Sequence, residues 1–85
     1  MSADEPELDL HGMRVAEAVR RASVFLVQEQ RRGTISVRII TGRGTGALKS
    51  AITDLLRSHP AVASTSFSLH TDAVVLVKLN PPRRA

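Results

Sequence analysis

A β-branched segment between two helical patterns is the feature that most restricts the fold of this chain. Residues 34–42 (TISVRIITG) are rich in β-branched side chains, and Ile39 and Ile40 place apolar groups on both faces. The segments at 15–32 and 45–59 instead repeat their apolar side chains at helical spacing. We therefore expect residues 34–42 to form a central strand, covered on both sides and flanked in sequence by two helices.

Each expected helix has an apolar stripe and a stop signal. Gly33 ends the first helix after two arginines, and Pro60 ends the second. The stripe of the first helix consists of Val15, Val19, Ala22 and Leu26, with Ala18 and Phe25 beside it. That of the second consists of Leu48, Ile52, Leu55 and Leu56. Both helices should pack one face on a sheet.

Three further segments alternate as strands do. LDLHG (8–12) is expected to be a short strand that runs into a turn, and VASTSFSLH (62–70) and AVVLVKLN (73–80) are joined by a tight turn near Thr71 and Asp72. The order strand-helix-strand-helix-strand-strand makes the first two strands parallel. We predict an α/β fold, a two-layer α/β sandwich with a four-stranded mixed sheet and two helices on one face. Residues 1–7 and 81–85 are expected to be a disordered leader and tail around one domain at 8–80.

Composition restricts the setting and the partners. The chain has 85 residues and no cysteine, and no apolar run approaches the roughly 18 residues that a membrane span requires. We expect a soluble, cytoplasmic domain that is monomeric in isolation and has no membrane partner. From residue 11 onward twelve basic side chains, ten of them arginine, face four acidic ones. This balance favours nucleic acid as a partner, although basic charge also serves solubility.

Two loops should meet at the carboxyl ends of the parallel strands, where open α/β sheets bind ligands. One is TGRGTG, in which Gly42, Gly44 and Gly46 let a ligand approach the backbone. Their amides, together with the N-terminus of the next helix, would form a site for a phosphate. Arg43 would reach the same phosphate, and Lys49 would add charge about one turn further on. Such a loop predicts a phosphate site; a tight strand-to-helix turn that simply needs glycine is the alternative. The spacing matches neither the P-loop nor the dinucleotide fingerprint.

The other loop, DLHG, contains Asp9 and His11. If strand geometry persists, both side chains project to the same side. His11 would then be a general acid or base beside the phosphate loop, and Asp9 would orient its ring or help to hold a metal ion. The alternative is a turn residue with a capping group. Elsewhere, His59 indicates a helix cap, and His70 with Asp72 indicates a hairpin turn.

The small numbers of carboxylates and of aromatic residues restrict the chemistry further. Past Asp9 the chain has only four scattered carboxylates, which is few for a two-metal nuclease. The two aromatic residues are Phe25, expected in the core, and Phe67, which alone makes no stacking platform. We therefore expect contact mainly with backbone phosphates, and strongly salt-dependent binding.

Together, LDLHG and RIITGRGTGALKSAI resemble the Smr (small MutS-related) domain, over about residues 8–79. The form at the C-terminus of bacterial MutS paralogues concerned with recombination and ribosome quality control is the most similar. The resemblance implies the same sandwich fold and an endonuclease that nicks DNA, including branched DNA, or cleaves RNA. It assigns cleavage to Asp9 and His11, and substrate binding to residues 42–46, that is Gly42, Arg43, Gly44, Thr45 and Gly46.

The metal requirement and the type of nucleic acid remain open at this stage. Cleavage of RNA would need no metal if His11 activates the 2′-hydroxyl, whereas cleavage of DNA would favour Mg²⁺ or Mn²⁺ near Asp9. A non-catalytic module that binds DNA, RNA or, through a larger parent protein, the ribosome is the alternative. The lack of glycine in SLHTDAVVLVKL, where the family usually has a glycine-rich segment, favours that alternative. A pure protein-interaction domain accounts poorly for the basic charge.

Overall fold

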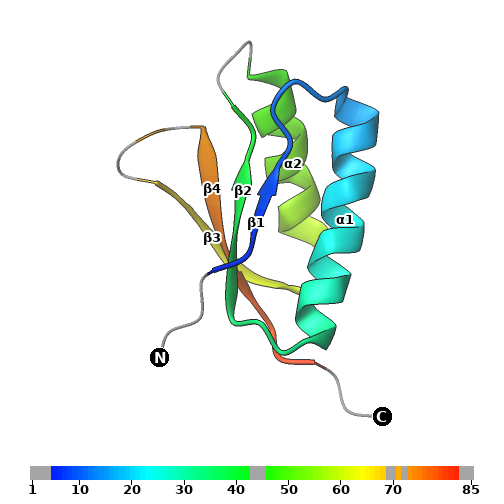
Figure 1. The fold of residues 1–85 in the computed structure, drawn as a ribbon, viewed down its shortest axis with the longest axis vertical. Coiled ribbons are helices and arrows are strands. Elements are labelled where there is room, and N and C mark those ends of the chain that lie inside the picture. Colours follow the sequence, from blue (N-terminus) through cyan, green and yellow to red (C-terminus); the bar gives the residue numbers. More distant parts are fainter. Residues whose placement is uncertain (1–4, 43–45, 69–70, 72, 83–85) are drawn as a thin grey trace.

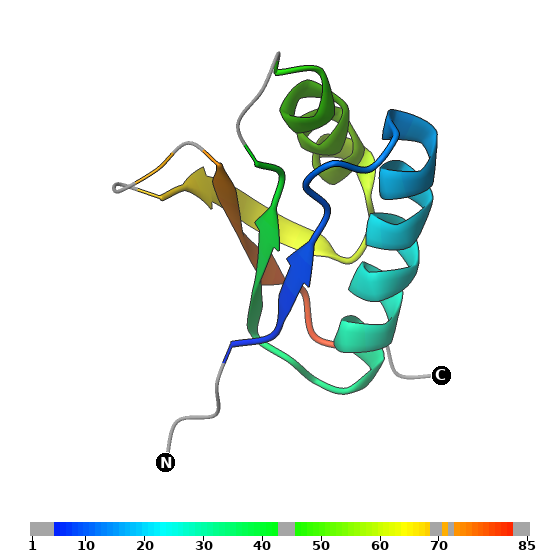
Figure 2. The same cartoon turned by 45° about the horizontal axis from the view of Figure 1, so that its top comes forward.

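A computed structural model of the chain describes residues 5–42, 46–68, 71 and 73–82. Within them the elements are β1 (Glu7–Asp9), α1 (Val15–Arg31), β2 (Ser36–Ile40), α2 (Ala47–Ser58), β3 (Val62–Phe67) and β4 (Val74–Leu79). This is the predicted order of strands and helices. Both helices lie on the same face of a four-stranded sheet, which makes the two expected layers (Figures 1 and 2).

The strand order in the sheet is β1-β2-β4-β3. β1 runs parallel to β2, with Leu8 opposite Ile39, and β4 runs antiparallel to both β2 and β3. β2 is therefore central, as predicted, but helices cover only one of its faces. Ile39 points to the covered face and is fully buried, whereas Ile40 lies on the open face and is half-buried. The expectation of a strand covered on both sides was wrong in this respect.

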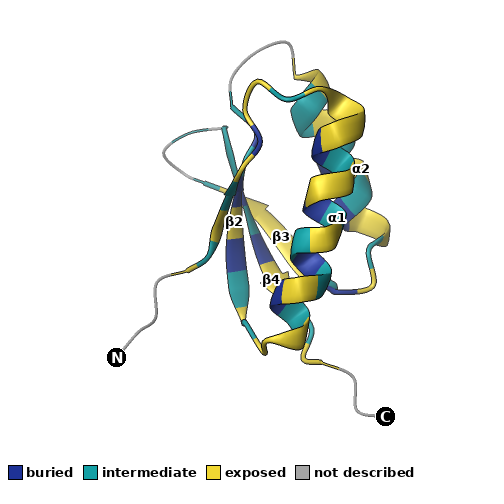
Figure 3. Ribbon diagram, turned by 45° about the vertical axis from the view of Figure 1, so that its right-hand side comes forward, coloured by how far each residue is buried: buried dark blue, intermediate teal, exposed yellow. Residues whose placement is uncertain are grey.

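The core lies between the helices and the covered face of the sheet (Figure 3). Alternate residues of β2 and β4 meet the buried stripes of the helices there. These buried residues include Val37, Ile39, Val75, Val77, Ala18, Ala22, Leu26, Ile52 and Leu56. Val15, expected in the stripe, is exposed because it is the first residue of α1, which begins beyond the tip of β1 (Figure 1).

Residues just outside the range 8–80 contact the sheet and α1. The carbonyl of Pro6 accepts a hydrogen bond from the Arg38 amide (2.9 Å), and Glu7 already belongs to β1, where it forms an ion pair with Arg38. At the other end, Gln30 Nε2 donates to the Pro81 carbonyl at 3.4 Å. Pro6, Glu7 and Pro81 thus join the sheet and its surroundings.

None of the helices in the described part of the chain is both long and apolar enough to cross a bilayer.

A buried charge in the last turn of α1 has local hydrogen-bond partners. Glu29 is only 6% exposed, and it accepts hydrogen bonds from Thr34 Oγ1 (2.8 Å) and Arg32 Nη1 (3.3 Å). These contacts tie the last turn of α1 to the segment that leads into β2.

Candidate functional site

Asp9 and His11 lie together at the carboxyl end of β1. Asp9 Oδ1 accepts from the backbone amide of His11 at 3.1 Å and lies 2.5 Å from His11 Nδ1. The first of these bonds closes an Asx turn, in which an aspartate bonds to the amide two residues on. β1 ends at Asp9, so this turn, rather than continued strand alternation, brings the two side chains together. Both side chains remain substantially exposed.

The contact between Asp9 and His11 determines which ring nitrogen is free. In the neutral imidazole, Nδ1–H donates to Asp9 Oδ1, and Nε2 then carries the lone pair. No residue in the described part of the chain bonds to Nε2. The hydrogen bonds from His11, side chain first and backbone second, lower the pKa of Asp9 from its ordinary value of 3.8. Asp9 is therefore a carboxylate at neutral pH and holds the ring for proton transfer at Nε2.

Gly42 brings the second loop against the first. Its φ is +79°, and a Cβ built on it would lie 2.8 Å from the Cβ of His11. A side chain there would push His11 away, so a glycine is required for two reasons. The Leu10 amide also donates to the Ile40 carbonyl at 2.8 Å, and this bond holds the two strand ends side by side. The predicted convergence of the two loops is confirmed at Gly42 and His11.

The amide of Gly42 is already used inside the fold. The Ala73 carbonyl, just before β4, accepts from the amides of Thr41 (2.8 Å) and Gly42 (3.2 Å), and Thr41 Oγ1 lies 3.3 Å from the same oxygen. Gly42 thus contributes shape to the site. Contrary to our expectation, its N–H donates to Ala73 and is not free for a phosphate. Arg43, Gly44 and Thr45 lie outside the described residues, as do His70 and Asp72.

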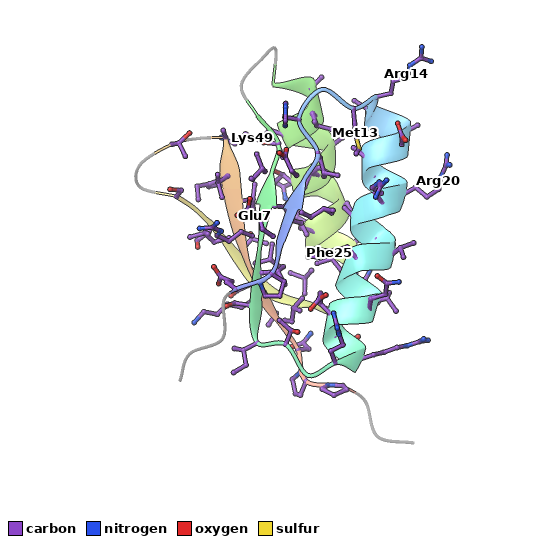
Figure 4. All side chains as sticks on the ribbon, viewed as in Figure 1. Glu7, Met13, Arg14, Arg20, Phe25 and Lys49 are labelled. Carbon is purple, nitrogen blue, oxygen red and sulfur yellow. The ribbon has the colours of Figure 1, made fainter. Side chains whose placement is uncertain are left out.

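Gly46 and Lys49 mark the start of α2. Gly46 is the N-cap, with φ of +90°, and provides no side chain to accept from the first-turn amides. The first turn has no acidic residue and contains Lys49. A cation there opposes the helix dipole, at a cost of about 0.3–1 kcal/mol, so the positive charge is not placed for helix stability. Figure 4 shows Lys49 at the same end of the molecule as Met13, in the loop after β1.

Phe67 is a neighbour of this site that the sequence reasoning missed. The Lys49 ammonium lies over its ring, 4.7 Å from the centroid. Phe67 is the last residue of β3 and is 47% exposed, whereas Phe25 packs against the core between α1 and β1 (Figure 4). The strand pattern placed Phe67 near a strand end. Its neighbour on α2 could not be found from the spacing of residues along the chain.

Among the described residues, the site offers the carboxylate of Asp9 for a metal ion. No cluster of three or more metal-ligating side chains occurs among the described residues. Oδ1 of Asp9 bonds to the amide and Nδ1 of His11, and the Asp9 side chain is 47% exposed. A single carboxylate suits Mg²⁺ or Mn²⁺ only where waters and substrate phosphates complete the ligand set. Asp9 would be the residue that holds such an ion.

The family model of the Smr domain matches residues 8–80, a range that contains both loops and every described element except the first residue of β1. The chain belongs to the Smr family. Among curated proteins, this Smr domain is 47% identical over 60 residues to Endonuclease MutS2 of Halalkalibacterium halodurans. It is 48% identical over 59 residues to that of Symbiobacterium thermophilum. These matches cover 71% and 69% of the chain but only 8% and 7% of the relatives.

Solved structures agree with the fold of this Smr domain. The crystal structure of the Smr domain of Thermus thermophilus MutS2 superposes with a TM-score of 0.86 at 34% identity, and the match covers 89% of this chain and 99% of that one. The solution structure of the SMR domain of NEDD4-binding protein 2 gives 0.70 at 29% identity, covering 98% and 94%. The two-layer sandwich is therefore that of the Smr domain.

Proposed function

We propose that this Smr domain is a nucleic-acid endonuclease in which His11 is the general base and Asp9 orients it. The observation that carries the proposal is the 2.5 Å contact between Asp9 and His11 Nδ1, which leaves Nε2 without a partner among the described residues, in a side chain that lies against Gly42. The relatives named Endonuclease MutS2 support a nuclease, and the basic surface supports nucleic acid as its substrate.

RNA fits the described residues best as the substrate. His11 Nε2 would accept the proton of a 2′-hydroxyl, and the 2′-oxygen would then form a bond to phosphorus as the bond from phosphorus to the 5′-oxygen breaks. The protonated imidazole can return its proton to the departing 5′-oxygen. The products are a 2′,3′-cyclic phosphate and a free 5′-hydroxyl. Arg43 would neutralise the phosphate charge that develops, and Lys49 would add positive charge about one turn further on.

Cleavage of DNA would follow a different route, because DNA has no 2′-hydroxyl. A water molecule must then attack the phosphorus, and a divalent cation at Asp9 would supply its activation. His11 would accept a proton from that water at Nε2. The two routes therefore differ in their products and in their need for Mg²⁺ or Mn²⁺.

The test is a cleavage assay on labelled single-stranded RNA and on supercoiled plasmid, each with and without Mg²⁺ or Mn²⁺. Asp9→Ala and His11→Ala should each lower the cleavage rate by about 10²–10⁴-fold, the usual contribution of general acid-base catalysis. Asp54→Ala is the matched control, since Asp54 is exposed on α2 and its ion pair with Arg57 is long, at 3.9 Å. Identification of a cyclic phosphate would support the RNA route.

A non-catalytic module remains the competing function. It predicts that the wild-type domain cuts none of these substrates in any metal condition, yet binds them in a salt-sensitive manner. Cleavage that persists at the wild-type rate in both Asp9→Ala and His11→Ala would instead assign the chemistry to other residues. Either result would overturn the proposal.

A further inference from the structure

Phe67 keeps a large aromatic surface open at the functional end of the sheet. In the β3–β4 pairing it lies opposite Val75, which in turn lies opposite Ile39 of β2. Directly paired residues share a face, so Phe67 belongs to the covered face together with these two core residues. Val75 and Ile39 are buried, whereas Phe67 is 47% exposed. Phe67 thus occupies a core-facing position of β3, yet its ring is exposed to solvent.

The Phe67 ring is next to the positive charge of Lys49. The Lys49 ammonium lies 4.7 Å from the ring centroid, and it forms no ion pair within the described part of the chain. An exposed aromatic ring with a cation over it matches the two parts of one nucleotide, since the base presents a π-face and the phosphate a negative charge. Phe67 and Lys49 thus form a composite surface, which we call the Phe67–Lys49 surface.

The Phe67–Lys49 surface adjoins the candidate site along two elements. Val75, opposite Phe67, is two residues from Ala73, whose carbonyl accepts the amide of Gly42. Gly42 in turn lies against His11. Lys49 is in the first turn of α2, directly after the Gly46 cap of the glycine loop. A strand of nucleic acid held at the loop would therefore extend over this surface on its way past the site.

We propose that the Phe67–Lys49 surface is a nucleotide subsite, in which the Phe67 ring stacks on an unpaired base and Lys49 neutralises the phosphate of that nucleotide. The inference rests on the proposed function, and it specifies the substrate as single-stranded. A base inside a duplex is already stacked on both faces, so only an unpaired one can stack on a protein ring. Stacking is tolerant of sequence, because every base has a π-face.

Tryptophan fluorescence tests the stacking directly, because the chain contains no tryptophan or tyrosine. Phe67→Trp places a sole tryptophan in the subsite. A 2′-O-methyl oligouridylate of about eight nucleotides, within the usual range of single-strand sites, cannot be cleaved through its 2′-oxygen. Without metal, this oligonucleotide should quench the tryptophan as the base stacks on it. The matched control is Val24→Trp, whose parent residue is exposed on α1, and its fluorescence should not change.

Binding of the labelled oligonucleotide, followed by anisotropy, measures the contribution of the ring. Phe67→Ala should weaken binding about tenfold, as alanine substitution of a stacking residue does, and Phe67→Tyr should bind as the wild type. An abasic oligonucleotide of the same length should bind Phe67→Ala and wild type equally. Since Phe67 is half exposed, Phe67→Ala should keep the fold, which circular dichroism can verify.

The outcomes separate the subsite from the function on which it rests. If the wild type binds the oligonucleotide, but Phe67→Ala binds equally well and Phe67→Trp is not quenched, the subsite is wrong while nucleic-acid binding stands. If a duplex of the same length quenches Phe67→Trp as strongly as the single strand, the single-stranded specificity is wrong. If the wild type binds neither the single strand nor the duplex, the proposed function fails and the subsite fails with it.

Discussion

At the scale of single residues, the site depends on how closely two loops approach each other. Gly42 and His11 come together so tightly that there is no room for a β-carbon between them. Asp9 holds the ring of His11 from the other side through Oδ1. The position of the imidazole is therefore determined by a missing side chain on one strand end and a carboxylate on the other.

Gly42→Ala should lower the free energy of unfolding more than Gly33→Ala, although the two glycines have nearly the same backbone conformation. Gly33 has a φ of +81°, close to the +79° of Gly42, but open space where its Cβ would lie. Gly33→Ala should lower the free energy of unfolding by about 1 kcal/mol, the cost of left-handed backbone, and Gly42→Ala by about 2–4 kcal/mol with cleavage lost. Urea unfolding and the cleavage assay measure both effects. Equal losses in the two variants would contradict the steric role of His11.

Asp9 should titrate below 3.8, and removal of the His11 ring should return its pKa toward that value. The pKa is lowered in the folded state, so the stabilisation is fully present above 3.8 and is lost as the pH falls through the folded value. Carboxyl NMR titration of the wild type and His11→Ala measures the shift. His59→Ala is the control, since His59 contacts Ala61 and not Asp9. An unchanged pKa of Asp9 in His11→Ala would refute the hydrogen-bonded pair.

At the scale of elements, β2 connects the core to the site. Its alternate side chains Val37 and Ile39 are buried under the helices, and its carboxyl end leads directly to Thr41 and Gly42. It is hydrogen-bonded to β1 on one side and to β4 on the other. Since both neighbours carry parts of the site, the position of β2 sets the distance between those parts.

Ile39→Ala and Ile35→Ala should differ sharply, although the residues are four positions apart. Ile39 is fully buried, and its truncation should cost about 2–5 kcal/mol of the free energy of unfolding. Ile35 precedes β2 and is 76% exposed, so its truncation should change stability by less than about 0.5 kcal/mol. Chemical denaturation of both variants tests this. A similar loss in the two would mean that Ile39 is not a core position of β2.

Much of this architecture could be predicted from periodicity and glycine placement. The element order, the parallel first pair of strands and the meeting of the DLHG loop with Gly42 all follow from those patterns. The Asx turn at Asp9 and the contact between Lys49 and Phe67 do not. The Asx turn lies beyond the end of β1, where the twofold period no longer applies. The contact between Lys49 and Phe67 depends on how α2 packs beside β3, which the spacing along the chain does not show. The exposure of Val15 depends on where α1 begins relative to β1.

At the scale of the whole molecule, acidic and basic side chains are distributed unevenly along the chain. Acidic side chains are concentrated in the first ten residues, and Glu5 and Glu7 of that segment bond to Ser36 and Arg38 of β2. The remaining chain is strongly basic. Lys49 lies at the functional end, whereas Lys78 lies on the open face of the sheet, where it is paired in register with Ser36.

Salt dependence should distinguish the two lysines. For single strands, the logarithm of affinity falls with the logarithm of salt concentration by about 0.7 for each phosphate that is neutralised. Lys49→Gln should reduce this slope by about 0.7, and Lys78→Gln should leave it unchanged. Anisotropy titrations at several salt concentrations measure the slope. An equal effect of the two substitutions would place the nucleic acid over the open face of the sheet instead.

Leu10 lies between Asp9 and His11 and is completely buried. Its amide donates to Ile40, and its carbonyl accepts from Met13 at 3.1 Å. Asp9 and His11 are thus mounted on one anchored residue rather than on two independent elements. A small movement of the core would carry both of them together, so their mutual alignment is insulated from it. Such a movement would instead change the direction from which the His11 imidazole would meet a phosphate at the neighbouring loop.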